Sequence, residues 1–304
     1  MKRQAAFIDS RKLLKGALHC HTTRSDGRGT PEEVLRKHAE HGYDFVALTD
    51  HRYYNFANYG DAPLTIIPGM EMDGNLPGVG WPYVHCHHIV SIGPEKAQGN
   101  GFEQDQRFES LRLSKPEDTQ ALLDKLHAAN HLTIYCHPEW SGTPAQEFMH
   151  MKGNFAMEIW NSGCVLENHQ DTNAAYWDEL LFDGQHIWGV ATDDGHAMDQ
   201  HCRGWVCVKA DNNVPAILKA LESGDFYAST GPEIHDFYVE DGVAHIECSP
   251  VQSVEFISWR MPSRVVEGQD MTHIESSFHP NVGYLRASVI DAAGRRAWTN
   301  PIFF

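Results

Sequence analysis

The stretch that decides the fold, residues 19–51, reads HCHTTRSDGRGTPEEVLRKHAEHGYDFVALTDH. It opens with two histidines one residue apart, His19 and His21, directly after the apolar pair Ala17-Leu18. Side chains two positions apart on a strand point to the same face, so both imidazoles would face one side of a sheet. The stretch ends in His51, which follows a second apolar run. We therefore expect histidines at the ends of two neighbouring strands.

A helix is predicted between these two strands. Thr30 suits the N-cap, Pro31 suits the first helical position, and Glu33 completes a capping box. Gly42 is a suitable residue to end the helix. The next apolar run, Phe45–Leu48, then reads as a strand parallel to the first, because parallel pairing requires a crossover of this kind.

Polar residues that could carry chemistry recur along the chain, nearly all at the end of a short apolar run. An α/β barrel presents side chains from successive strand ends to one common face. Imidazole and carboxylate together are the ligands of zinc, manganese or iron. We therefore predict a multinuclear metal hydrolase. The predicted metal ligands are His19, His21, Asp26, His51, Glu71, His88, His137, Asp194 and His196.

Alternating strands and helices continue to about residue 230. Helices are predicted over about 118–130, 172–182 and 214–223, and the segment 95–116 reads as a long loop and a candidate lid over the site. Seven or eight β/α units within about 230 residues favour a barrel over an open sheet.

After Gly231-Pro232 the pattern changes to strand alternation. The turn Asp241-Gly242 joins two alternating runs into a predicted hairpin, and further strands are expected over 254–259 and 284–290. We predict two domains, an α/β barrel over residues 1–231 and a small all-β, sandwich-like domain over residues 232–304.

Composition limits the partners and the compartment. The net charge of −17 argues against nucleic acid or an anionic membrane as a partner, since both reward basic patches. Seven cysteines without a close CxxC pair argue against a disulfide framework, and Cys20 and Cys136 read as small buried residues. The first residues lack the apolar core of a signal peptide, and no window reaches the length of a membrane span. We expect a cytoplasmic protein, of an oligomeric state that the sequence leaves open.

The same residues resemble the PHP family, the polymerase and histidinol-phosphatase superfamily of metal-dependent hydrolases. The opening stretch looks like the family's first motifs, and the later ones follow in order as IPGMEMDG, HHIVSIG, CHPEW and GVATDDGH. The resemblance covers about residues 16–230, and the tail looks like the C-terminal β extension of a stand-alone branch. It implies a distorted, TIM-like (βα)7 barrel that holds up to three metal ions, and it implies cleavage of phosphoesters.

The resemblance also implies how the ligands divide among two to three divalent ions of zinc, manganese or iron. The first ion would take His19, His21, Glu71 and Asp194. Glu71 would bridge to a second ion, which His88 and His137 complete. The third would take Asp26, His51 and His196. The catalytic roles then fall to Glu71, Asp194 and His196.

Two of these ligand positions stay open between neighbours in the sequence. His88 begins an apolar run and is preferred to its rivals His85 and His87. Asp194 is preferred to Asp193 because it completes an Asp-x-His spacing like that of the first histidine pair.

Other polar and aromatic residues are expected around the ligands. Asp50 should point away from the metal face and support the ligands from behind. Glu158 and Asn161 end a strand on the active face, where they either orient ligands or cap local structure. Trp140 and Trp160 either form an aromatic wall or pack at the rim of the barrel.

Arg24 and Arg203 are the candidates for gripping a substrate anion, and solvated surface arginines are the alternative. The expected function is hydrolysis of a small anionic phosphoester, a nucleotide or sugar phosphate, by a metal-bridging hydroxide. One alternative is an amide or carbamate-ester hydrolase on the same site. The other is a PHP module that binds metal without catalysis.

Overall fold

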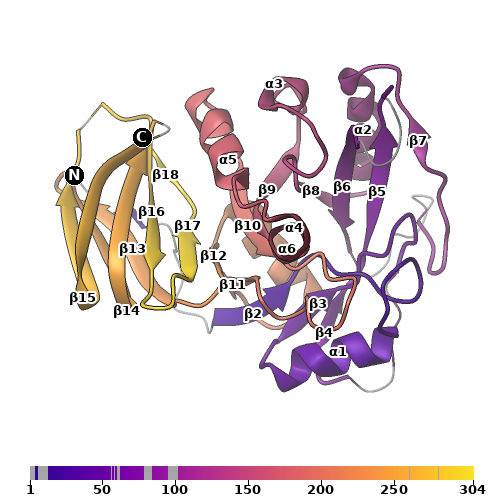
Figure 1. The fold of residues 1–304 in the computed structure, drawn as a ribbon, viewed down its shortest axis with the longest axis horizontal. Coiled ribbons are helices and arrows are strands. Elements are labelled where there is room, and N and C mark those ends of the chain that lie inside the picture. Colours follow the sequence, from indigo (N-terminus) through magenta and orange to yellow (C-terminus); the bar gives the residue numbers. More distant parts are fainter. Residues whose placement is uncertain are drawn as a thin grey trace.

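The computed structural model describes residues 4–5, 13–55, 57, 59, 62–78, 84–94, 102–259, 261–279 and 281–304. Within them the chain has a mixed α/β fold with two β-sheets, one of twelve strands and one of six. Figure 1 shows the helices gathered with the early strands in one part of the molecule, and the late strands, in orange and yellow, standing beside them.

One half of the α/β part belongs to the twelve-stranded sheet. Its strands there run in the order β12 (Phe226–Ser229), β11 (Trp205–Lys209), β2 (Leu13–Ala17), β3 (Phe45–Ala47) and β4 (Thr65–Ile67). β2, β3 and β4 pair in parallel, as the helical crossover between the first two predicts. β11 is antiparallel to both of its neighbours.

The six-stranded sheet supplies the other half. Its order is β10 (Trp188–Thr192), β9 (Asn154–Asn161), β8 (Leu132–Tyr135), β6 (Cys86–Ile92), β5 (Gly69–Asn75) and β7 (Leu111–Arg112). β10, β9 and β8 are parallel, whereas β6 runs antiparallel to β8 and to β5.

Helices cover these strands. The described helices are α1 (Pro31–Glu40), α2 (Thr119–Ala128), α3 (Ala145–Phe148), α4 (Ser162–Asn168), α5 (Asn173–Phe182) and α6 (Val214–Ser223), with a 3₁₀ turn η1 (Pro116–Asp118) before α2. The predicted capping box is confirmed, because the Thr30 hydroxyl accepts from the Glu33 amide and the Glu33 carboxylate accepts from the Thr30 amide. Gly42 follows at φ +75°, a conformation that favours glycine at a helix end.

The closed barrel is not confirmed. Among the described residues, the two sheets meet in this part of the molecule through the isolated bridges Cys20–Gly195 and His51–Glu71 rather than through a continuous ladder. The described residues also hold six α-helices, fewer than seven or eight β/α units require. The overcount arises because β5 and β6 are antiparallel neighbours, and antiparallel strands need no crossover helix.

The late strands form the rest of the large sheet. They are β13 (Ile234–Glu240), β14 (Val243–Ser258), β15 (Met261–Ser277), β16 (Tyr284–Ile290), β17 (Arg296–Thr299) and β18 (Ile302–Phe303), joined by β1 (Gln4–Ala5). The predicted hairpin is present, with Asp241 and Gly242 both at positive φ in the turn between β13 and β14. Alternate residues of these strands, among them Phe237 and Phe256, form most of an apolar core that also takes in Cys207 of β11 and Tyr227 of β12.

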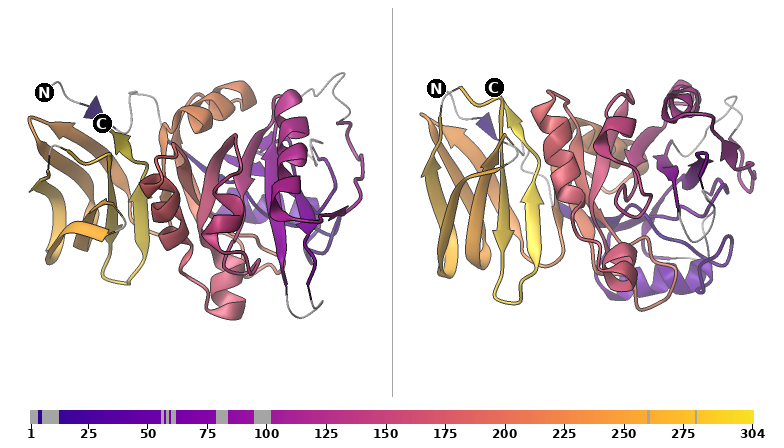
Figure 2. Two further views of the ribbon diagram at one scale, coloured as in Figure 1. Left: turned by 90° about the horizontal axis from the view of Figure 1, so that it is seen from above. Right: turned by 45° about the horizontal axis from the view of Figure 1, so that its top comes forward.

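The late strands are tied to the α/β part by hydrogen bonds and a buried ion pair. β17 pairs with β12, so the large sheet continues from one part into the other. Figure 2 shows the late strands, in orange and yellow, beside the α/β part in two further views. Arg286, only 2% exposed, forms two hydrogen bonds of 2.9 and 2.6 Å with the carboxylate of Asp178 on α5. The division into domains at residues 231 and 232 stays a prediction.

Several other expectations meet the structure only in part. Residues 95–101 of the predicted lid and residues 1–3 and 6–9 of the N-terminal segment lie outside the described residues. All seven cysteines are free, and Cys20 and Cys136 are buried as expected. No helix in the described part of the chain is long and apolar enough to cross a membrane.

Candidate metal centre

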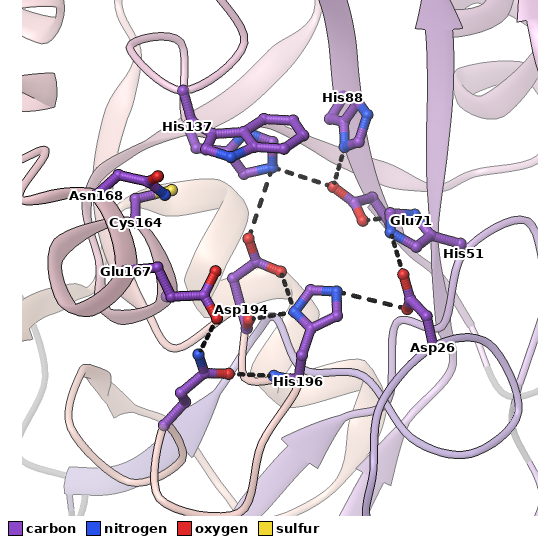
Figure 3. A pocket seen from close by; sticks show the side chains of 13 residues that line it. Asp26, His51, Glu71, His88, His137, Cys164, Glu167, Asn168, Asp194 and His196 are labelled. Atoms are coloured by element: carbon purple, nitrogen blue, oxygen red, sulfur yellow. Dashed lines mark hydrogen bonds and ion pairs between the residues drawn. The ribbon is translucent and has the colours of Figure 1, made fainter. Parts of the chain in front are cut away.

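The nine predicted ligands lie together at the strand ends of the α/β part. Figure 3 shows most of them converging on one cavity of about 380 Å³. Seven of the nine line this cavity, and the other two, His19 and His21, are fully buried beneath it. The sequence order of the motifs therefore becomes a single cluster in space.

Four ligand atoms form the first ligand group, His19, His21, Glu71 and Asp194. The two Nε2 atoms of the histidines are 3.2 Å apart. They lie 3.4 and 3.3 Å from Oε2 of Glu71, and 3.3 and 3.0 Å from Oδ1 of Asp194. A tetrahedron with bonds of about 2.0–2.1 Å to a central zinc ion has edges of about 3.3–3.4 Å. The group therefore has the dimensions of a four-coordinate metal site.

Hydrogen bonds behind the histidines fix which ring nitrogen faces the centre. Nδ1 of His19 lies 2.6 Å from Oε1 of Glu158, to which it donates, so the lone pair of Nε2 faces the first ligand group. Nδ1 of His137 is likewise engaged by the Ser141 hydroxyl at 3.1 Å. A carboxylate or hydroxyl behind the ring is the usual support of a metal-binding histidine.

Glu71 connects the first ligand group to a second one. Its Oε2 atom faces His19 and His21, while its Oε1 atom lies 2.8 Å from Nδ1 of His88 and 3.3 Å from Nε2 of His137. Glu71 is fully buried. One carboxylate thus presents one oxygen to each group, which is the geometry of a bridging ligand. We call Glu71, His88 and His137 the second ligand group.

The third ligand group is more open to solvent. Asp26 lies 3.6 Å from Nε2 of His51 and 3.4 Å from Nε2 of His196, measured from its two carboxylate oxygens. The Asp26 side chain is 55% exposed and that of His196 is 34% exposed. Nδ1 of His196 donates to the carbonyl of Asp194 at 2.9 Å, which leaves its Nε2 free to bind. His21 also has a ring nitrogen near this group.

The charges of the buried carboxylates in this cluster favour the binding of cations. Burial disfavours the carboxylate form, yet the surrounding histidines, His51 and His19 first, hold the pKa of Glu71 well below its ordinary value. Burial also opposes charge on His21, but Asp194 and Glu71 raise its pKa to about 9. Buried carboxylates therefore draw cations into the cluster, and metal ions compete with protons for the same nitrogen atoms.

Unpartnered buried atoms point the same way. Oε2 of Glu71, Oδ1 of Asp194 and Nδ1 of His51 are buried, and none makes a hydrogen bond of good geometry among the described residues, although Oε2 of Glu71 and Nδ1 of His51 lie 2.9 Å apart and Oδ1 of Asp194 lies 3.0 Å from Nε2 of His21. Such atoms are costly unless a cation or water completes them. Together with the spacing of the first ligand group, they show that the residues present fit divalent metal ions.

Two ligands sit on strained backbone. His137 has φ +25° and Asp194 has φ +48°, a region that non-glycine residues seldom adopt. Each lies two residues beyond the end of its strand, β8 or β10, and the Asp194 amide donates to the carbonyl of His19 across the gap between the sheets. Strain of this kind is retained where the surrounding structure demands it, commonly at functional sites.

The structure places His88 and Asp194 in the cluster and their rivals elsewhere. Nδ1 of His87 lies 2.6 Å from the Tyr135 hydroxyl on the other side of β6. His85 pairs with Glu147 at 2.7 Å, away from the cluster. Asp193 turns its carboxylate to the backbone amides of residues 202–204 at 2.6–2.9 Å.

The predicted supporting residues lie behind the ligands. Asp50 is buried and accepts hydrogen bonds from the amides and hydroxyls of Thr22 and Ser25, so it holds the loop that carries Asp26. Glu158 accepts from His19, from the His137 amide and from Thr192. Asn161 donates to Glu158 and to Oδ2 of Asp194.

The predicted substrate-binding arginines are placed differently from each other. Arg24 lines a smaller cavity of about 320 Å³ that shares Asp26 and His51 with the main one, and it lies there beside Arg52 and Arg107. Arg203 lines neither cavity. Its Nε atom donates instead to the carbonyl of Asp199 on the surface, so its geometry does not favour contact with a substrate.

The two tryptophans named from the sequence also lie in different places. Trp140 lines the main cavity, with its ring 5.6 Å from that of His88 and 5.1 Å from that of His137. Trp160 does not line it, and packs instead at the edge of the apolar core.

Sequence reasoning missed one wall of the cavity. Cys164, Glu167 and Asn168, labelled in Figure 3, come from α4, and Gln200 completes this wall. The helix was not predicted because it is short and follows β9 without a break. A signal was present, since Asn161 is a good N-cap residue and its side chain accepts from the Cys164 amide.

Comparisons with known proteins address the fold. No family model matches the chain, and no curated protein matches it. Among solved structures, a two-domain protein from Bacteroides vulgatus that contains a predicted PHP-like metal-dependent phosphoesterase is similar over 99% of this chain and 98% of its own, with a TM-score of 0.51 and 14% identity. This likeness confirms the resemblance to PHP-like proteins at the level of the fold.

Two further solved structures are similar over a smaller part of the chain. An amidohydrolase from Chromobacterium violaceum covers 60% of this chain and 88% of its own, with a TM-score of 0.42 and 15% identity. A proposed metal-dependent phosphoesterase from Bifidobacterium adolescentis covers 62% of this chain and 88% of its own, with a TM-score of 0.40 and 14% identity. Scores at this level do not establish a shared fold.

Proposed function

We propose that the chain is a metal-dependent hydrolase that cleaves a small phosphoester, such as a nucleotide or sugar phosphate. The observation that carries the proposal is the first ligand group, whose four atoms have the spacing of a tetrahedral metal site. Glu71 extends it to the second ligand group. The fold shared with a protein that contains a predicted PHP-like metal-dependent phosphoesterase supports the same class of reaction.

Divalent ions in such a centre supply a water-derived nucleophile at neutral pH and neutralise charge on a transferred phosphoryl group. The residues of the chain fix where this happens. Glu71 sets the distance between the first and second ligand groups, and Asp194 reaches both through its two oxygens, at 3.0 Å from His21 and 3.7 Å from His137. Asp26 and His196 are the more exposed ligands, so substrate meets the centre from their side.

The small cavity next to the third ligand group favours an anionic substrate. It brings together three guanidinium side chains, Arg24, Arg52 and Arg107. Arginine matches the oxygens of phosphate through paired hydrogen bonds. A phosphoester bound at the metals could place a phosphate oxygen, or a second acidic group, against this cavity.

One observation favours the second candidate, hydrolysis of an amide or carbamate ester. Among the described residues, those lining the main cavity include no lysine or arginine. Glu167 adds a carboxylate there, held by Gln200 at 2.6 Å. This wall suits a neutral or cationic group better than a second anion. The catalytically inactive alternative is disfavoured because the full set of predicted ligands converges.

A substrate panel tests the proposal. Metal-replete protein would be assayed on phosphomonoesters, phosphodiesters, neutral amides and carbamate esters, with Glu71→Gln measured alongside. We expect turnover of phosphoesters that the substitution abolishes. Turnover confined to amides or carbamates would favour the second candidate, and no turnover of any class by protein with a filled centre would contradict an enzymatic role.

A further inference from the structure

A second cluster of side chains of the kinds that bind metal ions lies next to the candidate metal centre. It consists of His38 on α1, Asp193 at the end of β10 and His201 in the loop that follows, and we call it the rear cluster. All three side chains are buried, with 0%, 0% and 3% of their surfaces exposed. One ligand atom from each lies within 4.8 Å of the other two.

The hydrogen bonds around His38 leave a lone pair without a donor. Nδ1 of His38 donates to the carbonyl of Val34 at 2.8 Å. In the neutral ring its Nε2 atom is then an acceptor, and it faces Oδ2 of Asp193, another acceptor, at 3.8 Å. Two acceptors that face each other inside a protein repel unless a cation or a shared donor lies between them.

His201 adds two more atoms without partners. Neither of its ring nitrogens has a hydrogen-bond partner among the described residues, and the same holds for Nε2 of His38 and the hydroxyl of Tyr43. The ring of Tyr43 packs against that of His38 at 4.8 Å. Four unpartnered polar atoms in one buried place are unusual, because nearly all buried polar groups in proteins are satisfied.

We propose that the rear cluster binds a divalent metal ion of the zinc class, separate from the ions of the catalytic centre. Two imidazoles and one carboxylate are typical zinc ligands, and a water molecule or a hydroxyl would complete four-coordination. The tetrahedral edge for such ligands is about 3.3–3.4 Å, so the 3.8 Å gap between His38 and Asp193 needs a small contraction, and His201, within 4.8 Å of both, has to move toward them as the ion binds.

Such an ion would be structural, because its ligands join three segments that frame the catalytic centre. His38 belongs to α1, Asp193 directly precedes Asp194, and the His201 ring packs on Gly195. A Cβ atom added at Gly195 would meet Nδ1 of His201 at 2.5 Å, which shows how closely the ring lies against the backbone between two predicted ligands. The ion would thereby hold Asp194 and His196 in place without touching substrate. The proposal does not depend on the reaction that the enzyme catalyses.

Anomalous diffraction from crystals of the wild-type protein, grown with zinc(II), tests the proposal directly. We expect an anomalous peak among His38, Asp193 and His201 in addition to peaks at the first ligand group. Density there without an anomalous signal, in crystals that show peaks at the catalytic centre, would identify a water molecule and overturn the proposal.

Metal analysis of variants gives an independent test. After exhaustive dialysis against a chelator, wild-type protein should keep one equivalent of zinc, because the rear cluster is closed to solvent. His38→Gln and His201→Gln should each lose that equivalent. His131→Gln is the matched control, since His131 is also 2% exposed and also has an unpartnered ring nitrogen, but lies elsewhere. Equal zinc retention in all four proteins would overturn the proposal, and if the variants do not fold, the diffraction result decides.

Discussion

The Nε2 atoms of His19 and His21 lie 3.2 Å apart, and both face the same oxygens of Glu71 and Asp194. Two imidazole nitrogens cannot approach this closely as bare acceptors without a cation or proton between them. The HxH motif thus has a physical consequence beyond placing two rings on one face. It creates a position surrounded by electron-donating atoms, where a positive charge is stabilised.

The first prediction concerns stoichiometry. Because three ligand groups are assembled, we expect two to three divalent ions per chain that a chelator can remove, measured by elemental analysis after growth with manganese, iron and zinc. Their removal should also lower the melting temperature, since an ion at 100 times its Kd stabilises a folded protein by about 2.7 kcal/mol. One removable ion or none would contradict the multinuclear assignment.

The second prediction concerns the bridging carboxylate. Glu71→Gln keeps nearly the same shape but removes the charge that two ligand groups share, so turnover of a true substrate should fall by at least about a hundredfold. Asp50→Asn should reduce turnover less, because Asp50 contacts the loop at Thr22 and Ser25 rather than the ligand groups. Steady-state kinetics of both variants would check this. A Glu71→Gln enzyme with full metal content and wild-type turnover would refute the bridging role.

The third prediction concerns Glu158. Its carboxylate holds the His19 ring and the His137 backbone at once, so Glu158→Gln should weaken metal binding by roughly 10–100-fold. Glu147→Gln is the matched control, because Glu147 pairs with His85 outside the cluster. Metal titration of both variants, followed by calorimetry, gives the comparison. Equal affinities would mean that Glu158 does not orient the ligands.

The fourth prediction separates the two arginines. Arg24 borders the small cavity beside the third ligand group, so Arg24→Ala should raise KM for an anionic phosphoester by roughly tenfold or more, the scale of a lost charged hydrogen bond. KM for a neutral substrate should change little. Arg203→Ala serves as the control, because Arg203 bonds to a surface carbonyl. If both variants behave alike, the small cavity does not bind the anion.

The fifth prediction concerns pH and stability. Burial lowers the pKa of His131 to about 4, whereas an unfolded histidine titrates near 6.5. Below pH ~6.5 the unfolded chain gains a proton that the folded chain refuses until pH ~4, so His131 makes the free energy of unfolding fall as pH falls through this window. His131→Gln lacks this effect.

Urea unfolding of the wild type and of His131→Gln at several pH values, both in the presence of the same chelator, measures how much His131 contributes to the free energy of unfolding. The stability advantage of the wild type over His131→Gln should shrink by on the order of 3 kcal/mol between pH 7 and pH 4. An advantage that stays constant across this range would show that His131 titrates normally in the fold.

The fold was predictable where one local signal decides one element. The capping box at Thr30 and Glu33 marked the start of α1, and the helix predicted over 214–223 has the bounds of α6. The sequence signals failed for strands whose formation depends on pairing with distant parts of the chain. β15 was not predicted because most of its described side chains are exposed, so it carries no apolar alternation to recognise. The antiparallel pairing of β5 with β6 left no signal in the sequence pattern, so the expected number of β/α units was too high.

The ligands were predictable because each combines a metal-binding side chain with a position at the end of an apolar run. The residues that contact substrate have no such combined signal and were not predictable. Arg24 and Arg203 look alike in sequence, and only the path of the loops places one beside the third ligand group and the other at the carbonyl of Asp199. The wall formed by α4 depends on a helix of seven residues, too short to show a period.

The side chain of Asn300 has a consequence for how the protein is made. Its oxygen accepts from the Gly189 amide in β10, and its amide donates to the carbonyls of Gly224 and Phe226. β10 is the strand that delivers Asp194. During synthesis all nine predicted ligands therefore leave the ribosome before Asn300, and the hydrogen bond that braces β10, the strand that leads to Asp194, forms only after residue 300 has emerged. Metal captured earlier by the nascent chain would be held by a frame that is still incomplete.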